Sequence, residues 1–280
     1  MAPLSAAQMR YSMRHAAFAI YVTYRFLQKR YPTNGKSAAI SDVELLPPDE
    51  SILEKRLQKI QALEKEPGKM LRIGTSGSVQ VAYKGQRFVF MALAALKQKG
   101  SCCYEYHLAG GEDDSVLRQM AEKMGIDDLV IFEGVMPHEQ IYEWLDSLDL
   151  YIQPSQQEGL SRALVEAMSR ALPAFASDVG GNPELLEPGC IHKCGSVKDI
   201  TEELENLTAG QMMTMAKYNY QKAGNFQKAV LQNNVGRSCG PLQKRRKHMF
   251  CGETGKMFGK ELVRDGESQP SFFTGCRLRP

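Results

Sequence analysis

Short apolar runs alternate with segments of helical periodicity between about residues 71 and 207. The alternation predicts strands at 71–75, 104–109, 129–133, 150–154 and 174–177, separated by helices at 85–99, 113–124, 137–147 and 161–171. Each predicted strand is a nearly continuous apolar run, as expected when helices cover both faces of a parallel sheet. The predicted fold class is therefore α/β, with a Rossmann-like parallel sheet.

The pattern divides the chain into three parts. Residues 1–69 hold an extended piece at 19–23, a helix-like run at 25–30 and, after Pro47-Pro48, a charged amphipathic stretch at 49–65 that predicts a linker helix. Residues 70–208 form the predicted domain. In residues 209–280 a helical run continues to about Asn233, after which apolar periodicity ends; composition leaves open whether this tail is ordered.

Composition narrows the class of protein. The 280 residues are 43% apolar and 24% charged, which is typical of a soluble globular protein, and the net charge of +3 gives no reason to expect a nucleic-acid partner. A basic run at 244–247 could bind nucleic acid, although a solvated tail is the simpler interpretation. The seven cysteines lack zinc-site spacing and predict reduced thiols. The first apolar stretch, 16–22, is far shorter than the roughly 20 residues of a membrane span, and no signal peptide is evident, so we expect a cytoplasmic protein.

The first candidate site is the turn that leaves the 71–75 strand. Small residues at Gly74, Gly77 and Ser78 lead to Lys84 and Gly85 at the predicted start of a helix. A lysine at the positive end of a helix dipole is unfavourable unless an anion compensates, and free amides there bind phosphate. The segment therefore predicts a phosphate site, while a solvated lysine beside an ordinary loop fits it equally well. It matches neither the P-loop nor the G-x-G-x-x-G pattern, which argues against a standard kinase or dehydrogenase.

The second candidate site follows the 150–154 strand, at a carboxyl end where open α/β sheets bind ligands. Gly159 allows close backbone approach, and Ser161 is a suitable N-cap. Glu158 and Glu166 are eight positions apart, roughly 12 Å along a helix, so they cannot share one proton or one metal. With Glu158 in the turn, both can border one elongated ligand and accept hydrogen bonds from separate hydroxyls. Alternatively, Glu158 stabilises the helix start and Glu166, outside the buried stripe of 163, 164, 167, 168 and 171, is simply solvated.

Other polar residues are weaker candidates. The pairs Asp113-Asp114 and Asp127-Asp128 could suggest a metal, but aspartate is favoured as a cap at helix starts and turns. His107 and His138 have no nucleophile near them in the sequence, and we expect them to be structural or exposed.

Taken together, the motifs resemble those of the retaining glycosyltransferases of GT-B fold known as glycosyl transferases group 1, or family 4. The resemblance covers most of residues 83–184 and depends on the order of several motifs. These are Tyr83-Lys84-Gly85-Gln86, His107 to Gly111, Val130 to Gly134, Asp149 to Ser155, the E-x7-E pair Glu158 and Glu166, and Val179 to Glu184.

The resemblance implies a donor site for a nucleoside diphosphate sugar. Lys84 would bind the diphosphate, Glu158 the transferred sugar and Glu166 the ribose, with transfer that retains the anomeric configuration without a cofactor or a bound metal. Lys84 and Glu158 are thus the predicted catalytic residues. The turn at Val135 and Met136 would approach the base, and the backbone amides of Gly159, Leu160 and Ser161 would help to hold the phosphates. The full set of predicted substrate-binding residues is Gly77, Ser78, Gly85, Gly134, Val135, Met136, Ser155, Gly159, Leu160, Ser161 and Glu166.

Two departures from the family pattern keep alternatives open. The family commonly has an arginine six residues before the lysine, where this chain has Ser78. The family also has a complete N-terminal acceptor domain, of which residues 1–48 resemble only the last elements, 19–23 and 41–46. We therefore weigh an enzyme that acts on a glycan or lipid-linked acceptor, at the inner face of the membrane or free in the cytoplasm, against a donor-binding half-enzyme or inactive fragment that needs a partner chain. A GT-B-like sugar-nucleotide epimerase is a third possibility.

Overall fold

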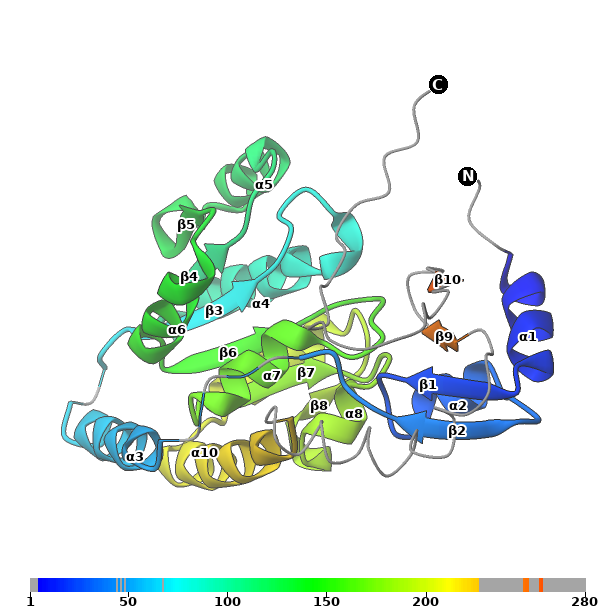
Figure 1. The fold of residues 1–280 in the computed structure, drawn as a ribbon. Coiled ribbons are helices and arrows are strands. Elements are labelled where there is room, and N and C mark those ends of the chain that lie inside the picture. Colours follow the sequence, from blue (N-terminus) through cyan, green and yellow to red (C-terminus); the bar gives the residue numbers. More distant parts are fainter. Residues whose placement is uncertain are drawn as a thin grey trace.

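The computed structural model describes residues 5–43, 45, 47, 49–66, 68–226, 249–251 and 257–258 (Figure 1). Within these residues the larger sheet has six parallel strands in the order β5-β4-β3-β6-β7-β8. The strands are β3 (Leu71–Ser76), β4 (Tyr104–Ala109), β5 (Val130–Gly134), β6 (Leu150–Gln153), β7 (Ala174–Ser177) and β8 (Ile191–His192). The predicted α/β class with a parallel sheet is confirmed.

Helices connect the strands and cover the sheet. The helix α4 packs with α5 and α9, while α7 packs with α6 and α10. The chain runs from β3 through β4 to β5 in one direction along the sheet, then returns to β6 and continues to β8 in the opposite direction. Because βαβ crossovers are right-handed, the helices that follow these two directions are expected to cover opposite faces of the sheet. These helices are α4 (Gln86–Lys99), α5 (Ser115–Met124), α6 (His138–Ser147), α7 (Arg162–Ser169), α8 (Asn182–Leu185), α9 (Val197–Glu205) and α10 (Ala209–Ala223).

Burial in the sheet follows strand position. Every residue of β6 and β7 is buried, as the apolar runs predict, but only Val130 is buried in β5, which is an edge strand. On α7 the buried face differs slightly from the prediction, because Val165 is buried whereas Ala163 is half-buried. Glu166 lies beside this face and keeps part of its surface exposed.

The order of the strands determines where a ligand can enter. The chain leaves β3 toward β4 on one side and β6 toward β7 on the other, so the order reverses between β3 and β6. In open α/β sheets, ligands bind at such a reversal, in the crevice outside the carboxyl ends of the two strands. Both candidate sites of the sequence, at residues 77–85 and 154–161, lie in the loops that follow these two strands.

The opposite, amino-terminal edge is held by the linker helix α3 (Ser51–Leu63). Its buried Arg56 donates hydrogen bonds to the carbonyl oxygens of Leu145, Leu148 and Arg170, at the ends of α6 and α7. Burial lowers the pKa of Arg56 to about 10. Lys59, one turn further on, forms an ion pair with Asp149 at 2.9 Å. These contacts fasten the linker to the sheet.

The N-terminal segment forms a smaller unit beside the sheet. It comprises α1 (Ala6–His15), β1 (Phe18–Tyr21), α2 (Phe26–Arg30) and β2 (Lys36–Ala39), with β1 parallel to β2. The strands β9 (Met249–Cys251) and β10 (Met257–Phe258) extend this second sheet in the order β10-β9-β1-β2. The rest of the tail, for which the sequence left order or disorder open, lies outside the described residues, as does the basic run at 244–247.

One carboxylate joins the N-terminal segment to the core. Glu184 of α8 accepts hydrogen bonds from the backbone N–H groups of Tyr24 at 2.6 Å, Arg25 at 3.0 Å and Phe26 at 2.7 Å, at the start of α2. A carboxylate suits this position, because the first amides of a helix lack partners within it. The segment is therefore docked on the loop after β7, next to the crevice.

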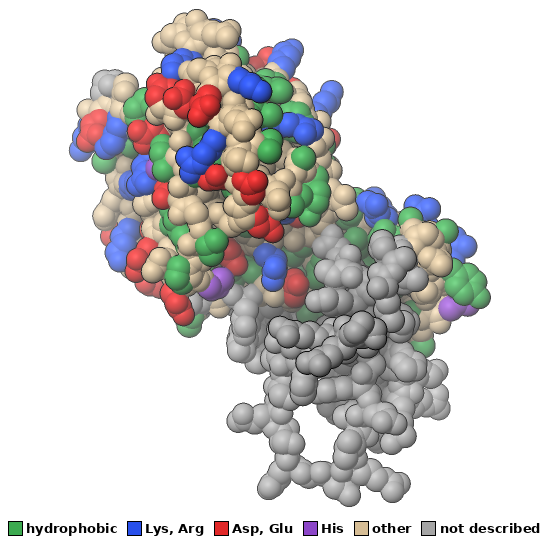
Figure 2. All heavy atoms as spheres, turned by 90° about the horizontal axis from the view of Figure 1, so that it is seen from above, with side chains coloured by type: hydrophobic (Ala, Val, Ile, Leu, Met, Phe, Trp, Pro, Cys, Tyr) green, Lys and Arg blue, Asp and Glu red, His purple; other side chains and the backbone are tan. Residues whose placement is uncertain are grey.

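The surface carries charges of both signs. Basic and acidic side chains lie interspersed on the coloured surface of Figure 2, in keeping with the net charge of +3. Among the described residues, no helix combines the length and apolar character needed to cross a bilayer.

Candidate functional site

The loops at the carboxyl edge of the sheet pack closely on one another. Gly85 has a φ of 78°, and a Cβ there would lie 2.0 Å from the carbonyl oxygen of Pro154. The amide of Gln156 donates to the carbonyl of Tyr83 at 2.7 Å, so the β3–α4 loop is fixed to the β6–α7 loop. A Cβ on Gly110 would likewise lie 1.8 Å from the carbonyl oxygen of Gly77. Glycine at these positions lets the backbones meet.

Lys84 and Glu158 are in direct contact. The ammonium Nζ of Lys84 donates to Glu158 Oε1 at 2.7 Å, and both side chains are mostly buried, with 22% and 10% of their surface exposed. The Glu158 oxygen also accepts from the hydroxyl of Ser155 at 2.8 Å and from the amide of Gln153 at 3.3 Å. The stem of Lys84 lies near Gly77. Both predicted catalytic residues therefore lie in one place.

The local structure at Lys84 differs from the prediction. Lys84 ends the short 3₁₀ helix η1 (Ala82–Lys84), and α4 begins two residues later at Gln86, after the left-handed Gly85. The expectation that Lys84 occupies the first turn of α4 was wrong, because the left-handed backbone of Gly85 separates Lys84 from the start of the helix. The positive charge is consequently set in front of the helix N-terminus, beside the carboxylate of Glu158.

Glu166 lies on α7, the helix that follows the loop of Glu158. Its Oε1 lies 3.4 Å from Nε2 of His138, a residue with 64% of its side chain exposed, at the start of α6. Burial raises the pKa of the Tyr151 hydroxyl, and the charges of Glu166 and Glu158 raise it further. Glu158 contacts Gln153 at the carboxyl end of β6, and Glu166 lies on the helix that follows, beside the start of α6.

Several of the predicted substrate-binding residues make contacts within the protein. Ser161 is the N-cap of α7 and accepts from the amide of Leu164 at 3.3 Å. Ser155 and Leu160 are buried, and the Ser155 hydroxyl donates to Glu158, so in this structure its contact with a ligand would run through that carboxylate. Gly159 packs against Gly181 of the β7–α8 loop. Ser78 donates to the carboxylate of Glu112.

The turn after β5 reaches the same edge. Gly134 has a φ of 73° and accepts from the amide of Gly110 at 2.9 Å. Val135 is 79% exposed, whereas Met136 packs on the core. A Cβ on Gly111 would lie 2.7 Å from Cγ2 of Val135, so the β4–α5 and β5–α6 loops touch.

A small cavity of about 80 Å³ lies where the N-terminal segment faces Glu158. Its walls are largely apolar and aromatic, with the guanidinium of Arg30 as the cation; Arg30 lies over the rings of Phe26 and Tyr31 at 5.9 and 5.6 Å. The lining residues are Met9, Met13, Phe26, Leu27, Arg30, Tyr31, Gln157 and Glu158. The N-terminal segment thus forms a wall of the space next to the carboxylate.

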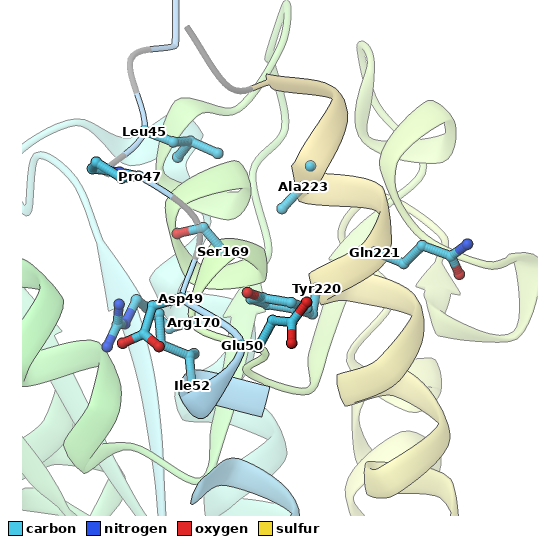
Figure 3. Close-up of a pocket in the computed structure, with 11 residues that line it drawn as sticks. Leu45, Pro47, Asp49, Glu50, Ile52, Ser169, Arg170, Tyr220, Gln221 and Ala223 are labelled. Carbon is cyan, nitrogen blue, oxygen red and sulfur yellow. The ribbon is translucent and has the colours of Figure 1, made fainter. Parts of the chain in front are cut away.

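A larger cavity of about 220 Å³ lies elsewhere, between α10, the end of α7 and the residues before α3 (Figure 3). Tyr220 of α10 points toward Asp49 and Glu50 across it. Its lining includes Arg170, whose carbonyl accepts from Arg56 at the amino-terminal edge of the sheet. It contains none of the predicted site residues.

The remaining candidates are structural in the described residues. Buried His107 lies 2.7 Å from Glu133 and accepts from Arg72 at 3.2 Å. Asp113 accepts from the amide of Ser115 in the turn before α5, whereas Asp114, the N-cap of α5, makes no capping hydrogen bond and pairs with Arg118 at 2.9 Å. Asp128 pairs with Lys97 at 2.6 Å in the short helix η2 (Asp127–Leu129).

The cysteines and metal-ligating side chains add no further site. Four cysteines of the described residues are free: Cys102, Cys103, Cys190 and Cys194. In the same part of the chain, no three histidine, cysteine, aspartate or glutamate side chains gather in a way that could hold a metal ion.

Gln153 and Tyr151 lie at the site, and the sequence did not predict a role for them. The amide of Gln153 reaches Glu158, and the Tyr151 hydroxyl reaches Gln153 at 2.9 Å. A signal was present, because a glutamine stands in an otherwise apolar buried strand, where an amide needs partners.

Comparison with known proteins decides the family. The family model described as glycosyl transferases group 1 matches residues 71–209, which include every loop of the site. The chain belongs to this glycosyltransferase family. Protein CapJ of Staphylococcus aureus is 31% identical over 197 residues, which are 68% of this chain and 46% of CapJ. The amylovoran biosynthesis glycosyltransferase AmsK of Erwinia amylovora is 35% identical over 138 residues, which are 46% of this chain and 34% of AmsK. This glycosyltransferase chain therefore spans less than half the length of both relatives.

Solved structures share the fold. A sucrose-phosphate synthase from Thermosynechococcus elongatus superposes with a TM-score of 0.68 at 16% identity, covering 85% of this chain and 61% of that one. HepE of Anabaena in complex with UDP-glucose superposes with a TM-score of 0.64 at 20% identity, covering 85% and 69%. The family's GT-B arrangement is confirmed at the level of the fold.

Proposed function

We propose that the crevice between β3 and β6 binds the nucleoside diphosphate sugar from which this glycosyltransferase moves a sugar, with retention of configuration, to a glycan or glycoconjugate. The observation that carries this proposal is the contact of Lys84 Nζ with Glu158 Oε1 at 2.7 Å, at the point where the strand order reverses. The ammonium of Lys84 suits the diphosphate of such a donor, and the carboxylate of Glu158 suits its sugar.

The two charges suit different parts of the donor. A carboxylate repels phosphate but accepts hydrogen bonds from sugar hydroxyls, whereas an ammonium stabilises the negative charge that grows on a departing diphosphate. Without a ligand, each group neutralises the other across the crevice. When the donor enters, the diphosphate takes Lys84, and Glu158 keeps its bonds from Ser155 and Gln153 while it receives the sugar.

The nucleoside would extend from this point toward Glu166 and the turn at Gly134. The side chain of Glu166 is 18% exposed, and its carboxylate would accept hydrogen bonds from the vicinal diol of the ribose. The exposed Val135 and neighbouring Met136 would face the base. HepE, which has the same fold, was solved with UDP-glucose, so a uridine diphosphate sugar is the first donor to test. We propose that no metal or cofactor takes part.

The acceptor would approach from the N-terminal side, where the small cavity adjoins Glu158. Because the chain spans less than half the length of CapJ and AmsK, a partner chain that supplies the rest of the acceptor site is the second candidate arrangement. In that case the chain is a donor-binding half-enzyme. We propose that the protein works in the cytoplasm, with a lipid-linked acceptor bringing it to the inner face of the membrane.

Calorimetric titration tests the proposal. UDP-glucose, GDP-mannose and ADP-glucose, and their free diphosphates, are titrated separately into the full chain, whose fold is checked by circular dichroism. We expect at least one donor to bind, with its affinity lowered by Lys84→Met. Failure of all six ligands to bind a folded chain would refute the proposal. Addition of candidate acceptors to the best donor then separates an active transferase, which releases the diphosphate, from a half-enzyme, which does not.

A further inference from the structure

We infer that the buried Gln153 positions the Glu158 carboxylate for the donor sugar through a hydrogen-bond chain that begins at the end of β3. The inference rests on the proposed function, because it assigns Glu158 to the sugar. It adds a positioning residue to the site, and it predicts which part of the donor depends on that residue.

The orientation of the Gln153 amide is fixed from one side. Its side chain is almost fully buried, and its Oε1 accepts from the hydroxyl of Tyr151 at 2.9 Å. The Tyr151 hydroxyl in turn accepts from the amide of Ser76 at 3.2 Å, so its own proton is free to point at Gln153. Burial raises the pKa of Tyr151, which keeps this proton in place at any physiological pH.

The other side of the amide faces the carboxylate. Because Oε1 is taken by Tyr151, Nε2 must point toward Ser155 Oγ at 2.8 Å and Glu158 Oε1 at 3.3 Å. The Ser155 hydroxyl uses its proton on the same Glu158 oxygen at 2.8 Å. Two neutral donors behind one carboxylate oxygen hold that oxygen inward and leave the second oxygen of Glu158 for a ligand.

This arrangement matters most once the donor is bound. In the free site Lys84 also holds Glu158, but a diphosphate competes for that ammonium. Gln153 and Ser155 then remain as its donors in the structure described here. Without the amide, Ser155 alone would hold the carboxylate, and its hydroxyl would lose the donor that fixes its own rotation. The loss should therefore fall on the sugar of the donor and spare the nucleotide.

The test compares donor and nucleotide binding in Gln153→Leu. We expect this variant to bind UDP within twofold of the wild type and UDP-glucose about tenfold more weakly, since hydrogen bonds to charged groups contribute most where both partners are desolvated. GDP-mannose with GDP, or ADP-glucose with ADP, replaces this pair if the wild type prefers that base. A second variant, Tyr151→Phe, frees the amide to rotate without removing it and should show a smaller loss in the same direction. The double variant should lose no more than Gln153→Leu alone.

A matched control is available in the neighbouring strand. Tyr106 of β4 is as buried as Tyr151, but its hydroxyl bonds to Thr75 and does not belong to the chain that reaches Glu158. Tyr106→Phe should leave the ratio of the two affinities unchanged. Equal weakening of UDP and UDP-glucose in Gln153→Leu, or no change in either, would overturn the inference while the proposed function stands. A wild type that binds none of these ligands would overturn both.

Discussion

Lys84 and Glu158 are 74 residues apart in the chain, yet their charged atoms lie 2.7 Å apart across the crevice. They come from the loops after β3 and β6, the two strands between which the order of the sheet reverses. The topology thus brings a cation and a carboxylate to the one edge where both can face the same ligand.

Loss of the Lys84 charge should weaken nucleotide binding. Lys84→Met keeps the stem beside Gly77 but removes the donor, and a charge-assisted hydrogen bond contributes about 1.5–3 kcal/mol, so we expect the Kd of UDP to rise at least about tenfold. Lys97→Met is the control, because Lys97 pairs with Asp128 on the surface at the far end of α4. If Lys84→Met bound UDP like the wild type, Lys84 would have no role in holding the diphosphate.

Glu166 should distinguish ribose from dideoxyribose. The proposed contact predicts that Glu166→Gln weakens UDP about tenfold, because the ribose hydroxyls lose a charged acceptor, while 2′,3′-dideoxy-UDP, which lacks both hydroxyls, changes less than twofold. Calorimetric titration of both nucleotides measures this. Glu122→Gln, an exposed glutamate on α5, should alter neither affinity. Equal weakening of the two nucleotides would remove ribose recognition from Glu166.

Arg56 should contribute strongly to stability. Its guanidinium donates to three carbonyl groups at the ends of α6 and α7, and Arg56→Met would leave these acceptors buried without that donor. We expect the free energy of unfolding, measured in urea, to fall by about 3 kcal/mol. The adjacent exposed Lys55→Met should change it by less than about 0.5 kcal/mol. A similarly small change for Arg56→Met would mean that α3 is held by its apolar face.

Glu184 should control the docking of the N-terminal segment. Glu184→Ala removes the acceptor of three backbone N–H groups at the start of α2, so local opening of residues 5–43 should become about tenfold more frequent. Limited proteolysis, with cleavage sites identified by mass spectrometry, measures this opening. Glu187→Ala, three residues further on, is the matched control. Unchanged cleavage in Glu184→Ala would show that apolar packing alone docks the segment.

Much of the sheet could be predicted from apolar periodicity. The predicted strands 104–109 and 174–177 match β4 and β7 at both ends, and the predicted helix 85–99 differs from α4 by one residue. The pattern did not reveal β2, whose four residues Lys36–Ala39 lack alternation, or β8, which has two residues. Such short strands depend on pairing with a neighbour, which a local pattern does not contain.

The site was predictable as a set of loops but not as a set of contacts. Motif order and the carboxyl-end rule placed Lys84, Glu158 and Glu166 near one crevice, but they assigned Lys84 and Glu158 to different parts of a ligand and did not foresee that they pair without one. That pairing depends on Gly85, which turns the chain before α4 and lets Lys84 face the β6–α7 loop. The same holds for Gln153, whose partner Tyr151 is defined by side-chain geometry within β6.

The most direct test of the donor site is a crystal structure of the chain with the tightest-binding nucleotide sugar. We expect diphosphate oxygens within hydrogen-bond distance of Lys84 Nζ, the sugar hydroxyls at Glu158 and the ribose hydroxyls at Glu166. A nucleotide bound in the cavity between α3 and α10, with Lys84 and Glu158 still paired and untouched by it, would refute the proposed donor site.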